Sequence, residues 1–401
     1  MKTSIGEPLT SDMPQDWEVV PLASLCRVIC DGTHFTPHYV SQGVPFYSVE
    51  NVTANDFANT KFITEEEHAV LVKRCLPERG DILMTRIGSL GDTKLVDWDV
   101  RASIYVSLAL LKLNERVTSG YLYRYTKSRA FVRDIEARAL LNAAPKKINM
   151  GEIGAVPIPV PKSKLEQEAI AAALGDADAL IEYLEQLVAK KRRIKQGAMQ
   201  ELLTGKRRLP GFSGGWEVRD FGELAAIRNV KIIASTVPAG TPCVELESID
   251  QGTGRLLGSI DAKGTSSKYS FKKGDVLFGR LRAYLKKYWL ATFDGICSTE
   301  IWPLIPRDDR TVGSFLHLLV QTSDFVDAAC ISYGTHMPRS DWSVLRKFSV
   351  QVPSRTEQEA ITNVLSDMDI ELAVLETKLA KARQIKDGMM QNLLTGRIRL
   401  V

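Results

Sequence analysis

Two stretches of the chain repeat apolar side chains at intervals of three and four residues. The stripes include Leu174, Ile181, Leu184 and Val188 in the first stretch, and Leu365, Leu372, Leu375 and Leu379 in the second. This heptad-like spacing is typical of a helix that packs along one side. The pattern therefore predicts two long helices, each of about 40 residues and about 60 Å in length.

Both predicted helices have start and stop signals. Each follows a proline and begins with a capping-box sequence, Ser-Lys-Leu-Glu at 163–166 and Ser-Arg-Thr-Glu at 354–357. In a capping box, the hydroxyl and the carboxylate satisfy free amides of the first turn. Gly205 and Gly396 stand where a left-handed residue is expected to end each helix.

The sequence is an internal duplication. Residues 166–209 align with 357–400 at an offset of 191, and 24 of the 44 positions are identical. Weaker echoes precede them, because Trp-Glu-Val at 17–19 returns at 216–218 and Gly-Asp-Ile-Leu at 80–83 returns as Gly-Asp-Val-Leu at 274–277. Each half thus consists of a variable body and a near-identical helical tail.

The two tails have nearly the same apolar stripe, so we expect them to pair with each other as a coiled coil. A helix of about 60 Å is too long to be buried inside one domain. An antiparallel pairing would place the two bodies at opposite ends of one rod, related by a pseudo-two-fold axis. The alternative is two separate amphipathic helices, each lying on its own body.

The bodies mix strand and helix signals, which predicts an α+β fold. Segments 80–85 and 103–108 indicate short strands between turns, whereas 120–141 and 312–329 have helical spacing. The predicted organisation is an N-terminal tail at 1–15, a first body at 16–160, a central repeat helix at 161–209, a second body at 210–352 and a C-terminal repeat helix at 353–401.

Composition changes this picture little. A chain of 401 residues with 44% hydrophobic and 25% charged residues is typical of soluble globular domains and excludes collagen-like and mostly disordered classes. We find no apolar stretch long enough for a membrane helix and no signal-peptide core, so we expect a cytoplasmic protein. The six cysteines form no CxxC pair and have no zinc-ligand spacing, which indicates reduced thiols.

The sequence gives no positive sign of an enzyme. We find no GxGxxG, no phosphate loop, no HExxH, no G-x-S-x-G and no Asn-Pro-Pro or Asp-Pro-Pro motif of an amino-methyltransferase. Five histidines and scattered carboxylates are present, but no pair stands at catalytic spacing. We therefore expect no metal and no cofactor on this chain.

Charge is more informative locally than in total. The net charge of +4 is only mildly basic, but residues 263–287 contain eight Lys or Arg side chains against a single Asp275, interleaved with aromatic residues. We interpret this segment as a phosphate-contacting surface, with Lys273, Arg280 and Arg282 as candidate contacts. The alternative is a solvated strand pair whose lysines protect a sheet edge.

A polar and basic segment also precedes each helical tail. The first, 142–149, contains Lys146, Lys147 and Asn149, and the second, 333–339, contains Tyr333, His336 and Arg339. Such side chains can read base edges in a major groove. The alternative is a turn that closes the body onto the helix. The remaining DNA-binding candidates are Arg86 and, in the loop 31–37, Thr33 and His34, although this histidine is equally compatible with an ordinary turn.

These motifs together resemble the specificity subunit of type I restriction-modification systems. The resemblance is carried by Pro-Ile-Pro-Val-Pro at 157–161, Glu-Gln-Glu-Ala-Ile, the heptad helix and Leu-Leu-Thr-Gly-Lys-Arg-Arg-Leu-Pro at 202–210, a pattern that recurs once with substitutions. Asp-Gly-Thr-His at 31–34 and Gly-Thr-His-Met-Pro-Arg at 334–339 are similar to segments of that family's target recognition domains. The resemblance covers nearly the whole chain.

The resemblance implies a non-catalytic, DNA-reading subunit. Two target recognition domains would each read one half of a bipartite site in double-stranded DNA, and the paired helices would act as a ruler between them. The helices would also dock two methyltransferase subunits, which supply S-adenosylmethionine and methylate adenine. Restriction subunits, which supply the motor and nuclease with ATP and Mg²⁺, would then join. The alternatives are a coiled-coil scaffold that does not bind DNA and a reading module of another methyltransferase or nuclease system.

The duplication adds two expectations of its own. The bodies differ while the tails are nearly identical, so the two half-sites should differ and the target should be asymmetric. A stiff helical rod would also fix the distance between the readers, so the spacer between half-sites should be strict to a base pair.

Overall fold

The computed structural model describes residues 13–140, 142–262, 265–331 and 338–401. Packing divides the chain into two units, of which unit 1 comprises Met1–Glu185 with Lys378–Val401, and unit 2 comprises Gln186–Thr377. Both units contain parts of the two long helices, α6 (Lys164–Leu202) and α11 (Arg355–Leu393). Each unit therefore combines one body with one end of each helix.

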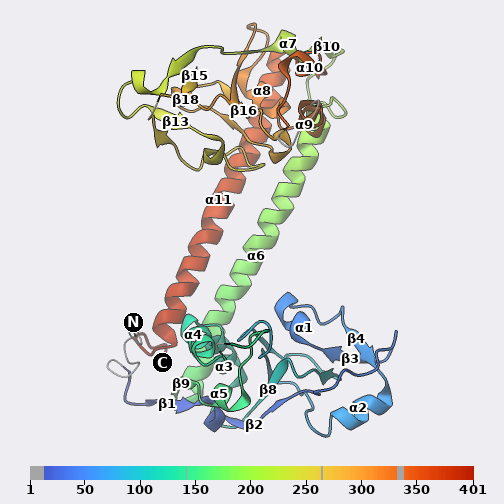
Figure 1. Cartoon of the computed structure of the whole chain (residues 1–401), viewed down its shortest axis with the longest axis vertical. Coiled ribbons are helices and arrows are strands. Elements are labelled where there is room, and N and C mark those ends of the chain that lie inside the picture. The colour runs from blue at the N-terminus through green and yellow to red at the C-terminus, as the bar shows by residue number, and fades with distance from the viewer. Residues whose placement is uncertain (1–12, 141, 263–264, 332–337) are drawn as a thin grey trace. The chain divides into compact units, whose positions relative to one another are not determined.

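The body of unit 1 is built on three small sheets (Figure 1). The main sheet is antiparallel in the order β2-β8-β5-β6, formed by Cys26–Asp31, Leu108–Leu113, Ile82–Thr85 and Thr93–Leu95. A second sheet has the order β4-β3-β7, formed by Lys61–Ile63, Val44–Tyr47 and Ser103–Ile104, with β3 and β7 parallel. The first and last strands of the body in sequence, β1 (Trp17–Pro21) and β9 (Pro157–Pro161), pair with each other.

The main sheet of unit 1 buries both faces. Ile82 and Met84 of β5 join one apolar cluster, whereas Leu83 between them joins another, as strand alternation requires. The first cluster also contains residues of α3 (Ser119–Thr126) and α4 (Arg129–Ala137), together with Leu174 of α6 and Leu393 of α11. The ends of both long helices are thus part of the core of this body. The shorter helices are α1 (Val49–Ala54), α2 (Glu65–Leu71) and α5 (Met150–Gly154).

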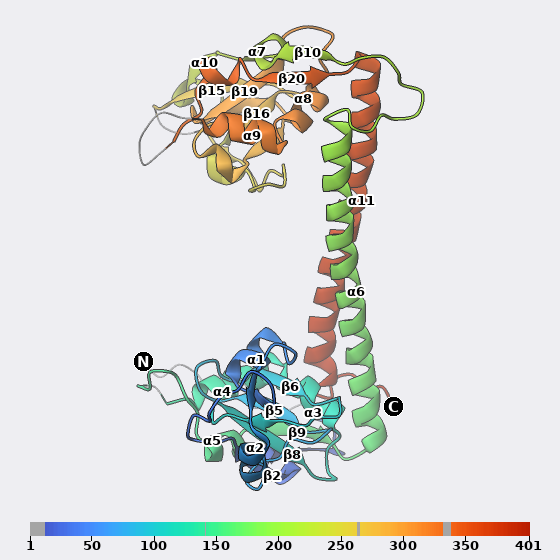
Figure 2. The same cartoon turned by 90° about the vertical axis from the view of Figure 1, so that its right-hand side faces the viewer.

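Unit 2 repeats this plan with its own elements (Figure 2). The main sheet has the order β11-β19-β16-β17, formed by Ala225–Ile227, Ile301–Pro306, Val276–Gly279 and Tyr288–Leu290. The first and last strands of this body in sequence, β10 (Glu217–Asp220) and β20 (Ser349–Val352), again pair. The helices are α7 (Phe221–Leu224), α8 (Gly313–Leu319), α9 (Ser323–Cys330) and α10 (Trp342–Leu345).

The second sheet of unit 2 is larger than its counterpart in unit 1. Its order is β12-β15-β18-β13-β14, formed by Lys231–Ile233, Ser267–Phe271, Gly295–Cys297, Pro242–Val244 and Ile260–Asp261. The pair β13 and β18 is parallel, like β3 and β7 of unit 1. The bodies are therefore α+β, as the sequence predicts, and they differ most in this second sheet.

The two long helices pair in an antiparallel direction within each unit. In unit 1, Asp178 pairs with Lys386 and Glu185 pairs with Arg383. In unit 2, Lys191 pairs with Glu371 and Lys195 pairs with Asp369. The residue number in α11 falls as that in α6 rises, which is the signature of an antiparallel pair. The predicted coiled coil is confirmed, and the alternative of two separate helices is wrong.

The predicted capping boxes are only half present. Ser163 Oγ accepts a hydrogen bond from the backbone N–H of Glu166 at 3.4 Å, as expected. The carboxylate of Glu166 does not return to the backbone, because it accepts hydrogen bonds from Trp17 Nε1 at 3.2 Å and from the guanidinium of Arg399. Glu357 repeats this arrangement with Trp216 and Arg208.

The ends of the helices and the thiols agree with the sequence. Gly205 and Gly396 have left-handed φ angles of 69° and 73°, as expected for residues that follow a helix end. All six cysteines are free. Within the described ranges, no helix has both the length and the apolar character needed to cross a membrane.

Candidate nucleic-acid interface

In both units, the loop that follows an inner strand of the main sheet, β5 or β16, contacts the segment that precedes the last short helix of the body, α5 or α10. In unit 1, Ile87 forms a β-bridge with Lys147, and Gly88 N donates a hydrogen bond to Lys146 O at 2.8 Å. In unit 2, Leu281 forms a β-bridge with Arg339, and Arg282 N donates to Pro338 O at 2.9 Å. The structure thus joins candidate segments that are far apart in sequence.

The unit 1 site presents Lys146, Lys147 and Asn149 to solvent. Among the described residues, neither lysine has an ion-pair partner, so both ammonium groups are available to a ligand. Asn149 is the N-cap of α5, but its side chain makes no capping hydrogen bond. Two cations and a free amide are the groups that contact phosphates and base edges in DNA complexes.

Arg86 has a different place from the other candidates, because it is buried, with a relative exposure of 8%. Its Nη1 donates to Asp31 Oδ2 at 3.2 Å and to Val106 O at 3.0 Å, and its Nε donates to Ile148 O at 3.3 Å. The guanidinium therefore holds the 146–149 segment against the sheet. In this structure Arg86 is a positioning residue of the site.

Asp31 is the shared acceptor of this part of unit 1. Besides Arg86, it pairs with Arg74 Nη2 at 2.5 Å and with His34 Nε2 at 2.9 Å. Burial alone would raise the pKa of Asp31, but the hydrogen bonds from Arg74 and His34 outweigh it and hold the pKa below its ordinary value. Asp31 is therefore ionised and connects the 31–37 loop to Arg86.

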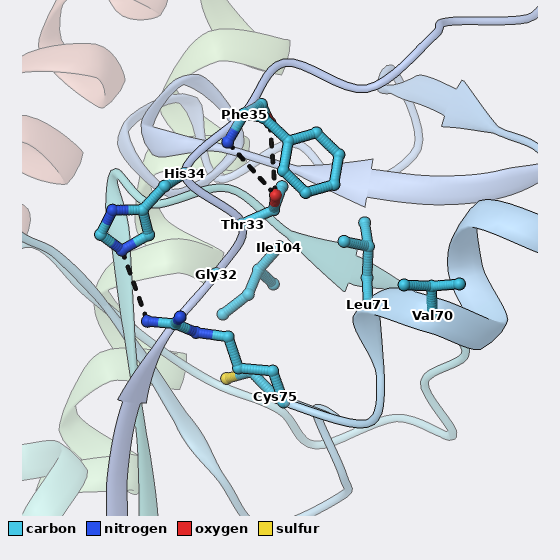
Figure 3. Close-up of a pocket in the computed structure, with 9 residues that line it drawn as sticks. Gly32, Thr33, His34, Phe35, Val70, Leu71, Cys75 and Ile104 are labelled. Atoms are coloured by element: carbon cyan, nitrogen blue, oxygen red, sulfur yellow. Dashed lines mark hydrogen bonds between the residues drawn. The ribbon is translucent and has the colours of Figure 1, made fainter.

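The 31–37 loop borders a pocket of about 270 Å³ (Figure 3). Thr33 is buried and its Oγ1 accepts a hydrogen bond from Phe35 N at 3.3 Å, which fixes the loop beyond the strand. His34 stands at the rim, with 61% of its side chain exposed. Val70, Leu71 and Ile104 form the apolar walls. Thr33 thus shapes the loop, whereas His34 can meet a ligand.

The unit 2 site is built on a longer and strained loop. Arg280 lies over the ring of Trp302, 5.1 Å from the centroid, and its Nε is buried without an acceptor among the described residues. Arg282 and Lys286 have positive φ angles of 53° and 50°, which are unfavourable for residues other than glycine. Such strain is concentrated at functional sites. Between them, Tyr284 is 52% exposed.

Arg339 is held next to this loop by a carboxylate. Its Nε and Nη2 donate to the carboxylate of Glu300 at 2.9–3.1 Å, while 48% of its side chain stays exposed. This ion pair raises the pKa of Arg339. Lys273 is exposed at a turn, where its backbone N–H donates to Asp294. The other two candidates, Tyr333 and His336, lie outside the described residues.

In the described part of the basic segment, residues 265–287, two lysines contact other parts of unit 2. Lys268 pairs with Glu245 and belongs to β15, which lies between β12 and β18 and is no edge strand. Lys287 donates through Nζ to Leu246 O at 2.6 Å. Both lysines therefore serve contacts inside unit 2. The edge interpretation fits Lys286, which is exposed and lies just before β17, the last strand of its sheet.

The predicted helix stripe is buried or half-buried, and its members Leu174 and Leu365 pack into the apolar clusters of the two bodies. Five of its eight residues are buried, namely Leu174, Leu184, Val188, Leu365 and Leu372. Ile181, Leu375 and Leu379 are half-buried. The stripe is thus used within the molecule. Exposed apolar side chains on the same helices are found at other positions.

Sequence reasoning missed the residues that assemble the sites. Arg74 and Glu300 were not candidates, because each acts on a partner about 40 positions away in sequence, Asp31 and Arg339 respectively. The only available signal was Asp31, which opens the Asp-Gly-Thr-His sequence. Among the described residues, no three His, Cys, Asp or Glu side chains are grouped so that they could hold a metal ion.

A family profile matches the chain twice. The type I restriction modification DNA specificity domain matches residues 14–191 and 213–384. These two matches cover both bodies and most of both long helices. They also coincide with the internal duplication of the sequence.

Individual relatives give the same result. The chain is 25% identical over 210 residues to the EcoDI specificity subunit of Escherichia coli, a stretch that covers 51% of this chain but 45% of that protein. It is 23% identical to the putative MjaX specificity subunit of Methanocaldococcus jannaschii, over 100% of this chain and 96% of the relative. The crystal structure of the S subunit from M. genitalium has the same fold, with a TM-score of 0.62 and 15% identity over 96% of this chain and 98% of that one.

Proposed function

Because the chain belongs to the family of type I restriction-modification specificity subunits, we propose that it reads an asymmetric, bipartite sequence in double-stranded DNA. One body would read each half-site. The two sites described above support this proposal, because each combines exposed cations with a structurally fixed loop. The difference between their side chains supports two different half-sites.

The observation that carries the proposal is the repeated bridge between two segments in each unit. Ile87 and Lys147 in unit 1 correspond to Leu281 and Arg339 in unit 2. The backbone arrangement is the same, but Lys147 is replaced by an arginine that is paired with Glu300. A scaffold protein would have no need to keep this arrangement while changing its side chains, whereas a pair of sequence readers would.

The exposed apolar residues of the helices support docking of two copies of one partner. Tyr183 and Ile194 of α6 are 60% and 47% exposed, and their counterparts one repeat later, Val374 and Ile385 of α11, are 48% and 53% exposed. Exposed apolar positions that recur at the repeat offset fit two identical methyltransferase subunits. Restriction subunits would join this assembly.

In this proposal, the chain itself performs no chemical step. S-adenosylmethionine, ATP and Mg²⁺ would be bound by the partner subunits in the cytoplasm. This chain would contribute the recognition of sequence and the placement of the methyltransferases. The isolated chain, incubated with DNA and either the methyl donor or ATP and Mg²⁺, should therefore neither methylate nor cleave.

The test is to map methylated adenines in a host that carries this chain with its methyltransferase. We expect one asymmetric motif with two defined half-sites and a spacer of one length. A matched host in which Lys146 and Lys147 are both replaced by Ala should lose methylation at that motif. Methylation without any bipartite motif, or an isolated chain whose DNA binding does not weaken with salt, would contradict the proposal.

A further inference from the structure

In each unit, one carboxylate of the helix pair is shared between the other helix and the body. In unit 1 this carboxylate is Asp178 of α6, which accepts a hydrogen bond from Arg124 of α3 and pairs with Lys386 of α11 at 2.5 Å. Arg124 and Asp178 are 23% and 33% exposed. The body, α6 and α11 therefore meet at one ion cluster.

In unit 2 the shared carboxylate is Glu376 of α11. It pairs with Arg192 of α6 at 2.7 Å and with Arg255, which lies in the segment between β13 and β14. Burial would raise the pKa of Glu376, but the two arginines outweigh this effect and lower it. This carboxylate stays ionised, and it again connects the body to both helices.

The helix-to-helix parts of these clusters follow the repeat, but the body arginines do not. Lys386 with Asp178 repeats Lys195 with Asp369, at the offset of 191. The residue of α8 that corresponds to Arg124 is Leu318, which is buried in an apolar cluster. Among the described residues, Asp369 has no cation from the body of unit 2. Each body thus has its own arginine anchor, placed on a different turn of the helix pair.

In α6, a glycine lies at a position that Arg124 approaches closely. Gly175 is in the interior of the helix, where glycine costs about 1 kcal/mol relative to alanine. A Cβ atom at this position would lie 3.2 Å from Nη2 of Arg124. The equivalent position of α11 is Ser366, where no such arginine crosses. The close approach of Arg124 therefore explains the glycine at position 175, and this contact has no counterpart at Ser366.

We infer that Arg124 and Arg255 are positioning residues that fix the angle between each body and the helix pair, and so determine how strictly the spacer between half-sites is discriminated. This inference rests on the proposed function. Each body is also held to the helices by apolar packing, which has no preferred direction. Hydrogen bonds fix each body at the start of one helix, through Gln167 in unit 1 and Gln358 in unit 2. In unit 1, Arg129 also pairs with Asp387 of α11 at 3.2 Å, but both side chains are largely exposed. A directional ion pair further along the helix limits rotation of the body about that packed core.

The test uses the full chain in complex with its methyltransferase and DNA duplexes whose spacer has the preferred length or one base pair more or less. In Arg124→Ala and in Arg255→Ala, we expect the preference for the correct spacer to fall about two- to fivefold, the range that corresponds to loss of a partly exposed ion pair. The base preference within each half-site should not change. Arg124→Lys and Arg255→Lys keep the charge and should retain most of the spacer preference.

The matched control is Arg101→Ala, which removes the ion pair with Glu65 on the body of unit 1, away from the helices. It should leave spacer preference unchanged. If Arg124→Ala does not fold, Arg255→Ala and Arg124→Lys decide the question. Unchanged spacer preference in variants that still bind the correct duplex would refute the inference while leaving the proposed function intact. A wild-type complex without any spacer preference would refute the proposed function itself.

Discussion

Asp31 shows how one side chain can hold a binding loop in place. Its carboxylate is 9% exposed and has three partners, Arg74, Arg86 and His34. A buried carboxylate loses hydration, and only several well-placed donors can compensate for this loss. Asp31 therefore stabilises the loop through its three partners.

Asp31→Asn should lower the free energy of unfolding at pH 7 by about 1–3 kcal/mol, because the buried Arg86 and the more exposed Arg74 both lose a charged acceptor. The depressed pKa of Asp31 means that its contribution is present above pH 3.8, its ordinary value, and is lost as pH falls below it. Denaturant titrations at several pH values should show the variant and the wild type converging as the pH falls through the lowered pKa of Asp31. Glu65→Gln, which removes an exposed pair, is the control and should change stability little. A constant difference at all pH values would contradict this assignment.

Arg282 is the side chain of unit 2 whose loss should affect reading most directly. It lies in the strained loop, and no hydrogen bond of its guanidinium to another described residue is found. Arg282→Ala should weaken DNA binding by about 1–3 kcal/mol and relax base preference in the second half-site only. Quantitative binding to duplexes with single base changes would measure this. Equal loss for changes in both half-sites would instead indicate a phosphate contact or a folding defect.

The sequence predicted residues by type and place but not by role. Lys146, Lys147 and Asn149 stand out because a short polar segment interrupts an apolar pattern, and they are exposed in the structure. Arg86 has the same chemistry but is buried against Asp31, 55 positions away. Burial of a charge depends on such distant partners, which local sequence does not disclose.

At the scale of an element, the Glu-Gln-Glu sequence shows how each long helix is attached to its body. Gln167 accepts a hydrogen bond from Thr118 N at 2.7 Å and donates to Arg116 O and Pro161 O. Gln358 makes the same three contacts in unit 2. A buried amide with all its partners present fixes the start of each long helix on its body. The sequence showed that this motif is repeated, but its partners could be found only in the structure.

The helices themselves were predictable because their signals are local. Heptad spacing, a serine cap and a terminal glycine all lie within the helix or one turn from it. Glu166 and Arg399 are 233 positions apart in the sequence, so local signals could not predict their contact. The sequence predicted instead that Glu166 completes a capping box. The second sheets of the bodies were largely missed, because their strands of two to five residues are too short to show a period. The predicted strand at 103–108 overlaps one of them, β7.

Lengthening the helix pair should change the spacer in proportion. Inserting four residues after Gln196 in α6 and four after Met368 in α11 keeps the ion pair between Lys195 and Asp369 on one side of the insertion. Arg255 lies on the body beyond the insertion and would separate from Glu376, so the new spacer should also be less strictly discriminated. Four residues add about 6 Å to a helix, close to the rise of two base pairs. The mapped methylation motif should therefore gain about two base pairs of spacer with both half-sites unchanged. Seven-residue insertions keep the heptad register and should add about three base pairs. An unchanged spacer would contradict the hypothesis that the length of the helix pair sets the distance between half-sites.

At the scale of the whole molecule, the duplication predicts how many methyltransferase subunits one chain binds. Tyr183 and Val374 are repeat counterparts that expose apolar surface on α6 and α11. If each is central to the docking site of one methyltransferase, Tyr183→Glu and Val374→Glu should each weaken one of two binding events at least about tenfold. Native mass spectrometry should then show one methyltransferase per chain for each single variant and none for the double variant. Val218→Glu replaces an exposed valine of β10 and should keep two. Loss of both partners in a single variant would show that docking is cooperative and that the two sites are not independent copies.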